Sequence, residues 1–149
     1  MEEKNYEVNK KYDEKILINV LKNFDKSGEY VVEPGRNEIK KFEIDIKNNL
    51  EKQNNKSENL ETKKMINIKK FKQKGFITNF FYRFKGSKAK RSYEYAKKLL
   101  EYKIKTPEPI AYFDDFVNKN NKKNSYYISE ELKYDFTCRE VFWPEDIER

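Results

Sequence analysis

The sequence predicts an α+β fold: a five-stranded antiparallel sheet with one packed helix after its third strand and a further helix near the N-terminus. Two stretches predict this most directly. Along 66–71, isoleucine alternates with polar residues at the period of a half-buried strand, so Lys69 shares one face with Asn67 and Phe71 while Lys70 shares the other with the isoleucines. After Ser87, apolar residues recur at helical spacing at Ala89, Tyr93, Ala96 and Leu100.

Length and composition indicate one cytoplasmic domain. With 149 residues, the chain can form one core but not two domains of ordinary size. Apolar residues make up only 36% of it, yet 11 Phe and 11 Tyr compensate, since each aromatic can bury about 150–250 Å². The single cysteine, Cys138, excludes an internal disulfide framework and fits a reducing compartment. There is no apolar leader and no apolar run of membrane length.

The net charge of +7 is concentrated in one part of the chain. Residues 69–105 contain thirteen Lys and Arg against two Glu, so this part is strongly basic and the remainder is slightly acidic. A basic patch of this kind predicts an anionic partner, which could be nucleotide phosphate, a lipid head group or nucleic acid. Nucleic acid has the least support, because the charge is not accompanied by a recognised nucleic-acid-binding motif.

Residues 1–27 are expected to form a polar segment and an amphipathic helix. The helix is predicted over 13–24 and ends before Ser27 and Gly28. Five apolar residues form one stripe along it, as expected for a helix that packs on a core: Ile16, Leu17, Val20, Leu21 and Phe24.

The sheet is expected to start with a hairpin. Residues 29–33 and 39–46 have the composition of strands, and the turn Pro34-Gly35-Arg36-Asn37 separates them. The next stretch, 47–64, is polar and has no apolar period, so we expect a flexible loop before the third strand.

After the third strand, Gly75 interrupts the pattern and 76–84 gathers five Phe and Tyr residues. This stretch is either a short helix that closes the core or a contact with a membrane surface or nucleic acid. The helix that follows is predicted from Ser87, its N-cap, to about Tyr102, and should pack through Tyr93, Ala96 and Leu100.

Two more strands complete the predicted sheet. They are expected at 110–113 and 125–132, with a polar turn over 118–124 between them. The sheet and its helix would thus form one unit over 28–143, followed by a short tail, 144–149.

Five short stretches, in this order, resemble the Kdo/WaaP lipopolysaccharide kinase family, which has the protein-kinase fold. They are Arg36-Asn37-Glu38-Ile39-Lys40; Ile68-Lys69-Lys70-Phe71; Tyr82-Arg83-Phe84 with Ser87-Lys88-Ala89-Lys90-Arg91-Ser92-Tyr93-Glu94-Tyr95-Ala96; Thr106-Pro107-Glu108-Pro109-Ile110-Ala111; and Ser125-Tyr126-Tyr127-Ile128-Ser129-Glu130. The resemblance covers roughly 28–143 and corresponds to the amino-terminal small lobe. It implies ATP-dependent phosphate transfer, with Mg²⁺, to an inner-core sugar of lipopolysaccharide at the cytoplasmic face of the inner membrane.

The resemblance also implies roles for individual residues. Lys69 is similar to the third-strand lysine that holds the α- and β-phosphates of ATP. The turn at Gly35 is similar to the loop over the phosphates, although it has one glycine where kinases usually have two or three. Glu130, Glu131 and Leu132 resemble the hinge, whose backbone amides and carbonyls would meet adenine.

The helix glutamate that pairs with this lysine in kinases has a poor counterpart here. The only central glutamate is Glu94, about 140° from Ala89 around the helix, so it should face solvent. Ser92 is better aimed at the sheet, but a serine cannot form the ion pair. Glu94 therefore remains a weak candidate for the partner of Lys69.

A second departure is larger. Only seventeen residues follow Leu132, which leaves no room for the large lobe with its catalytic aspartate and metal ligands, and the chain has no histidine. We therefore expect the chain alone to be inactive, as a truncated gene product, a fragment or a relic. Aromatic surface near Phe136, Phe142 and Trp143, which a large lobe would cover, should then be exposed.

The alternative hypothesis is a module without catalytic activity. It would bind anionic lipid or lipopolysaccharide through a basic helix face. The cations that would make this contact are Arg83, Lys88, Lys90 and Arg91.

Overall fold

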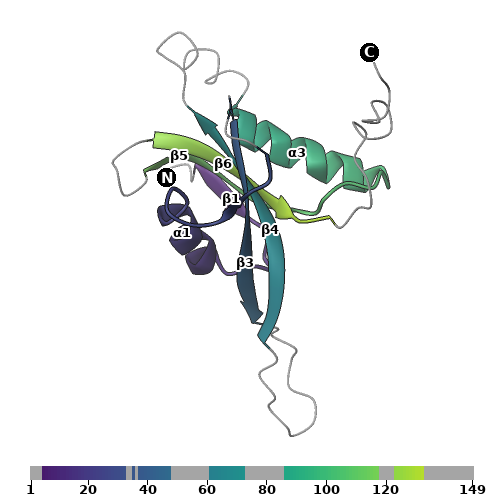
Figure 1. The fold of residues 1–149 in the computed structure, drawn as a ribbon. Coiled ribbons are helices and arrows are strands. Elements are labelled where there is room, and N and C mark those ends of the chain that lie inside the picture. The colour runs from purple at the N-terminus through teal and green to yellow at the C-terminus, as the bar shows by residue number, and fades with distance from the viewer. Residues whose placement is uncertain are drawn as a thin grey trace, which may run out of the picture.

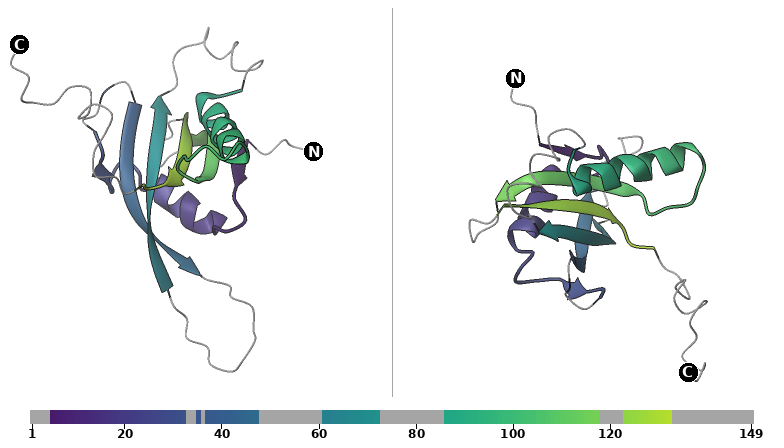
Figure 2. Two further views of the ribbon diagram at one scale, coloured as in Figure 1. Left: turned by 90° about the vertical axis from the view of Figure 1, so that its right-hand side faces the viewer. Right: turned by 90° about the horizontal axis from the view of Figure 1, so that it is seen from above.

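A computed structural model of the chain describes residues 5–32, 35, 37–47, 61–72, 86–117 and 123–132. These residues form a six-stranded antiparallel sheet with one helix on each face (Figures 1 and 2). The strand order is β1-β5-β6-β4-β3-β2. The elements are β1 Tyr6–Val8, α1 Glu14–Lys22, β2 Glu29–Tyr30, β3 Asn37–Lys47, β4 Glu61–Lys72, α3 Lys88–Glu101, β5 Pro109–Val117 and β6 Lys123–Glu130.

Strand β4 lies inside the sheet and separates two cores. It pairs with β3 on one side and β6 on the other, with Ile68 opposite both Lys40 and Ile128. Ile66 and Ile68 are fully buried in the core beneath α1, whereas Phe71 belongs to the core beneath α3. The alternation in the sequence thus predicted the two faces of this strand correctly, and it places Lys69 on the α3 side.

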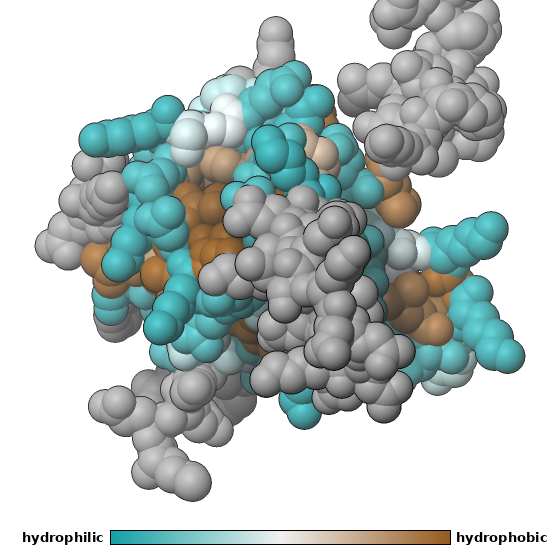
Figure 3. Space-filling view, turned by 90° about the horizontal axis from the view of Figure 1, so that it is seen from below, coloured by the Kyte–Doolittle hydropathy of each residue, from teal (hydrophilic) through white to brown (hydrophobic). Residues whose placement is uncertain are grey.

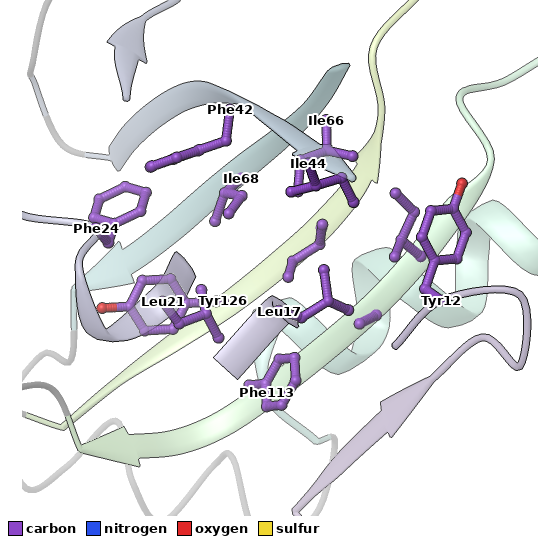
Figure 4. Close-up of a cluster of buried hydrophobic side chains, with 13 residues drawn as sticks. Tyr12, Leu17, Leu21, Phe24, Phe42, Ile44, Ile66, Ile68, Phe113 and Tyr126 are labelled. Carbon is purple, nitrogen blue, oxygen red and sulfur yellow. The ribbon is translucent and has the colours of Figure 1, made fainter. Parts of the chain in front are cut away.

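The larger core joins α1 to the sheet (Figure 4). Asp13 caps α1 by accepting a hydrogen bond from the Lys15 amide, and the apolar stripe of the helix then turns inward, with Leu17 and Leu21 fully buried. Phe24, just beyond the helix, packs edge-on against Tyr126 with ring centroids 5.4 Å apart. Each such buried side chain stabilises the fold by about 1.5–3 kcal/mol. The core beneath α1 has more buried side chains than the core beneath α3, so it contributes more to stability.

The smaller core joins α3 to β4, β5 and β6. Ser87 is the N-cap of α3, as predicted, and accepts from the Lys90 amide while its hydroxyl donates to Asp114. Tyr93 packs on Tyr112 with ring centroids 5.4 Å apart. This core is completed by Phe71, Ala89 and, partly buried, Tyr127.

The α+β class and the antiparallel sheet are confirmed, but the predicted number of strands is wrong. The described residues form six strands, not five, because Tyr6–Val8 in the supposedly polar N-terminal segment is a strand, β1. It pairs with β5, with Tyr6 opposite Phe113. Three residues are too few for a periodic signal, and this strand is held by pairing and by stacking of the Tyr6 and Phe113 rings at 5.2 Å.

Several boundaries also differ from the predictions: β2 ends at Tyr30 and not at residue 33, β5 spans Pro109–Val117 and not 110–113, and β6 ends at Glu130 and not at Leu132. The loop expected over 47–64 is shorter at both ends, because β3 extends to Lys47 and β4 begins at Glu61. The hairpin ladder continues here through backbone hydrogen bonds, which polar side chains do not prevent. The turn expected over 118–124 ends earlier, since β6 starts at Lys123. The predictions for 76–84, Phe136, Phe142 and Trp143 fall outside the described residues.

The predicted packing of α3 is correct for Tyr93 and Ala96 and wrong for Leu100, which is 40% exposed. The C-terminal end of α3 runs past the sheet, and the chain then turns back into β5 (Figures 1 and 2). Leu100 lies on the apolar stripe of the helix, but there is no sheet beneath it.

Gly28 gives a direct test of the packing beneath α1, because it lies against Phe42 of that core. Its φ is +85°, and a Cβ there would lie 2.4 Å from the Phe42 ring. We expect Gly28→Ala to lower the free energy of unfolding by about 1–3 kcal/mol, through left-handed strain and displacement of Phe42. Gly35 is the control, because a Cβ there would meet nothing within 4 Å. Urea denaturation should show Gly35→Ala within about 0.5 kcal/mol of the parent; equal effects of the two changes would contradict the described turn.

Candidate functional site

Lys69 lies on the part of the α3 face that the helix leaves open. It is opposite Tyr127 of β6 and Ile39 of β3, and it is partly buried. Its ammonium lies 5.2 Å from the centroid of the Phe71 ring, a cation–π distance. Among the described residues, no carboxylate forms an ion pair with it. The structure therefore presents a positioned cation beside α3 that can accept an anionic partner.

The orientation of α3 shows which of its sides borders Lys69. Lys97 and Tyr93 reach Glu7 of β1 at 2.9 and 3.1 Å, so this side of the helix faces the β1 edge. The Lys97 contact is the largest cause that lowers the pKa of Glu7. Ser92 and Leu99 lie on the opposite side of the helix, which therefore borders β6 and β4.

Neither helical candidate pairs with Lys69. Glu94 is exposed, as its position on the helix predicted. Ser92 is partly buried and its hydroxyl donates to the Lys88 carbonyl at 2.8 Å, within the helix. The ion pair that a kinase small lobe makes between sheet and helix is thus not formed by these residues.

Of the predicted hinge residues, Glu130 is the last residue of β6, and Glu131 and Leu132 follow it. The Glu130 amide donates to the Glu108 carbonyl at 2.9 Å and the Glu131 amide to the Met65 carbonyl at 3.1 Å. No described residue accepts from the Leu132 amide, and the Leu132 side chain is 48% exposed. Of the three amides, only that of Leu132 has no acceptor among the described residues.

The Glu130 side chain points to the α1 face, away from Lys69. It accepts hydrogen bonds from the Tyr12 hydroxyl, at 2.5 Å, and from the Lys64 ammonium. Burial acts to raise the pKa of Glu130, but the contacts with Lys64, Tyr12 and Lys11 outweigh it, and the pKa lies below its ordinary value. This cluster fixes the end of β6 to the N-terminal segment. The sequence analysis missed it, because Tyr12 and Glu130 are 118 residues apart.

The four predicted anion-contacting cations are not grouped together. Lys90 lies on the β1 side of α3, where its charge acts on Glu7 and Asp114. Lys88 and Arg91 lie on a different side of the helix, and neither forms an ion pair with a described carboxylate. The Arg91 Nε is buried without a hydrogen-bond partner, as is the Asn67 Oδ1 on β4. Arg83 is outside the described residues, and Gly35 is exposed with open space around it.

The structure also has a pocket of about 220 Å³ on the opposite face. Ile16, Ile44 and Ile46 form its apolar wall, and Lys10, Lys11 and Asp13 lie at its rim. It is separated from Lys69 by the sheet. No three Cys, Asp or Glu side chains in the described ranges come together as a metal site. Neither described helix has the length and apolar character needed to cross a membrane.

Comparison of the chain with models of protein families, with curated proteins and with solved structures gives no match.

The Glu130 cluster makes stability depend on pH. Because the pKa of Glu130 is lowered in the folded state, its contacts stabilise the fold above its ordinary pKa of 4.5, and this stabilisation is lost as the pH falls through the lowered value. We expect Glu130→Gln to reduce the free energy of unfolding by about 1–2 kcal/mol at pH 7 and by much less at pH 3. Urea denaturation at both pH values measures this. Glu43→Gln, in an exposed ion pair, is the control. A loss independent of pH would contradict the assignment.

Proposed function

We propose that this chain is the small lobe of a protein of the lipopolysaccharide-kinase type and that it contacts ATP through Lys69. The observation that carries the proposal is the position of Lys69: a strand lysine, partly buried beside α3, without a described anionic partner. A fixed point charge in such a position suits a polyphosphate.

The arrangement of the strands supports this proposal. Strand β4, which carries the lysine, is paired with β6, which leads into the hinge. Ile66 is opposite Glu130, and three residues of strand, about 10 Å, separate it from Lys69. Leu132 lies two residues beyond Glu130, so five strand residues, about 17 Å, separate it from Lys69 along the strands. A nucleotide with its adenine at the Leu132 amide would therefore have to extend along β4 for its phosphates to meet Lys69.

Transfer of phosphate requires groups that these residues do not supply. A base must orient the acceptor hydroxyl, and carboxylates must hold Mg²⁺ between the phosphates. In the family that the sequence resembles, these groups belong to the large lobe, so the small lobe would position ATP while a large lobe, in another segment or chain, acts on the inner-core sugar. Sequencing the DNA downstream of Arg149 would show whether a large lobe is encoded there.

A second candidate function is binding of anionic lipid or lipopolysaccharide at the cytoplasmic face of the inner membrane. The observation that favours it is that Lys88 and Arg91 of α3 are not paired with described carboxylates. Cations without ion pairs attract anionic head groups, each contributing about 1 kcal/mol near a membrane surface.

Nucleotide binding tests the first proposal. Without a second lobe, ATP should bind with a dissociation constant on the order of millimolar, or about −4 kcal/mol, with no detectable turnover. We expect Lys69→Ala to weaken binding about tenfold, because a charged contact to phosphate is lost. The control is Lys63→Ala, an exposed lysine of the same strand that pairs with Glu43. NMR titration with ATP measures both. Equal affinity for both variants would remove Lys69 from the site, and ATP hydrolysis lost in Lys69→Ala would show that the chain is not inert.

A further inference from the structure

The last turn of α3 and the residues after it form an exposed apolar surface, here called the α3 tip. Tyr102 is 77% exposed and Ile104 is 51% exposed. The tip consists of Leu99, Leu100, Tyr102, Lys103, Ile104 and Lys105; Glu101, the exposed acid of the same turn, lies about 160° from Leu99 around the helix and is not part of it. Figure 3 shows hydrophobic side chains with long hydrophilic ones beside them at the right-hand end of the molecule, where α3 ends in Figure 1.

The backbone at the helix end fixes this surface. The Ile104 amide donates to the Leu99 carbonyl at 2.9 Å and the Lys103 amide to the Leu100 carbonyl at 2.9 Å. These two hydrogen bonds are those of a Schellman motif, which holds Ile104 against the Leu99 turn. The two aliphatic side chains therefore belong to one ordered surface, although both remain exposed.

A lysine occupies the position of this motif that usually holds glycine. Lys103 has a φ of 59°, in the left-handed region that glycine adopts without steric cost and lysine seldom adopts. A cation therefore follows the C-cap Tyr102 directly, at a backbone position that is strained for lysine. Lys105, also exposed, adds a second cation two residues further on.

The exposed side of α3 continues the same chemistry along the helix. At 100° per residue, an arc of about 100° contains only basic, aromatic and aliphatic residues. The two acidic residues of the helix, Glu94 and Glu101, fall outside this arc. The residues in the arc are the partly buried Lys88 and Arg91 and the exposed Tyr95, Lys98, Leu99 and Tyr102. A surface with cations, aromatic rings and aliphatic groups but no acid complements an anionic lipid interface, where tyrosine rings lie at head-group level and aliphatic groups enter the acyl boundary.

We propose that the α3 tip is the part of the protein that inserts into an anionic membrane surface. The inference rests on the second candidate function and adds the site and the mode of binding: aliphatic insertion at Leu99 and Ile104, with Lys103 and Lys105 at the head groups. Nucleic acid would use the cations and the tyrosine rings but gains nothing from two exposed aliphatic side chains. The lipid surface is therefore the partner that the tip fits better.

Vesicle co-sedimentation tests the inference, with phosphatidylcholine vesicles compared to vesicles that also contain phosphatidylglycerol. The full chain should bind only the anionic vesicles, and more weakly as salt rises. Leu99→Ser combined with Ile104→Ser should reduce binding at least tenfold. Lys103→Gly, which keeps the left-handed turn, combined with Lys105→Gln should reduce it about fivefold for each cation removed. Far-UV circular dichroism checks that every variant remains folded.

Matched controls separate the possible outcomes. Val117→Ser removes an exposed apolar side chain from β5, and Lys15→Gln with Lys22→Gln removes two exposed cations from α1; both should bind like the parent. If binding depends on Lys88 and Arg91 but not on the tip, lipid binding stands and this inference is overturned. If neither the parent chain nor any variant binds the vesicles, both the second candidate function and this inference are overturned. Displacement by single-stranded RNA, with the aliphatic variants unaffected, would identify a nucleic-acid surface instead.

Discussion

The alternation of side chains along β4 is the constraint on which the rest of the structure depends. Ile66 and Ile68 enter the core beneath α1, and Lys70 shares their face, whereas Lys69 and Phe71 lie on the face of α3. A slip of one residue against β3 and β6 would exchange the two sets. It would remove Ile66 and Ile68 from the core, at about 1.5–3 kcal/mol each, and turn Lys69 toward α1. The same pairing that builds the core therefore also determines which lysine is available.

The α1 face provides hydrogen-bond or ion-pair partners for its buried lysines. Lys70, 8% exposed, lies 2.7 Å from Asp25 and 3.6 Å from Glu38. Lys40, 3% exposed, donates to the carbonyls of Phe24 and Ser27 at 2.8 and 3.1 Å. A buried ammonium without such partners would cost several kcal/mol, so the turn after α1 and the sheet require each other. These lysines are structural, and their charge is not available to a ligand.

The sequence predicted the elements whose signal is local and long enough to repeat. The faces of β4 follow from periodicity and the start of α3 follows from its N-cap Ser87, and both were predicted correctly. Strand β1 and the first residues of β4 were not, because β1 pairs with a strand about a hundred residues away and polar side chains conceal the β3–β4 ladder. For the candidate site, the sequence identified Lys69 and its face. It could not identify the hydrogen bond between Tyr12 and Glu130, which forms only in the folded chain.

The two faces of the sheet therefore differ in how their charge is balanced, and this difference indicates where an anion can bind. On the α1 face, the buried lysines already form hydrogen bonds or ion pairs with described carbonyls and carboxylates. On the α3 face, Glu7 engages one side of the helix, while Glu94 and Glu101 point away from the sheet. Lys69 thus lies where the described acids do not reach it, and because it is partly buried its surroundings have a lower dielectric than bulk water. An anion beside Lys69 would supply a contact that no described carboxylate makes, so of the two faces the α3 side is the one that suits the proposed phosphate contact.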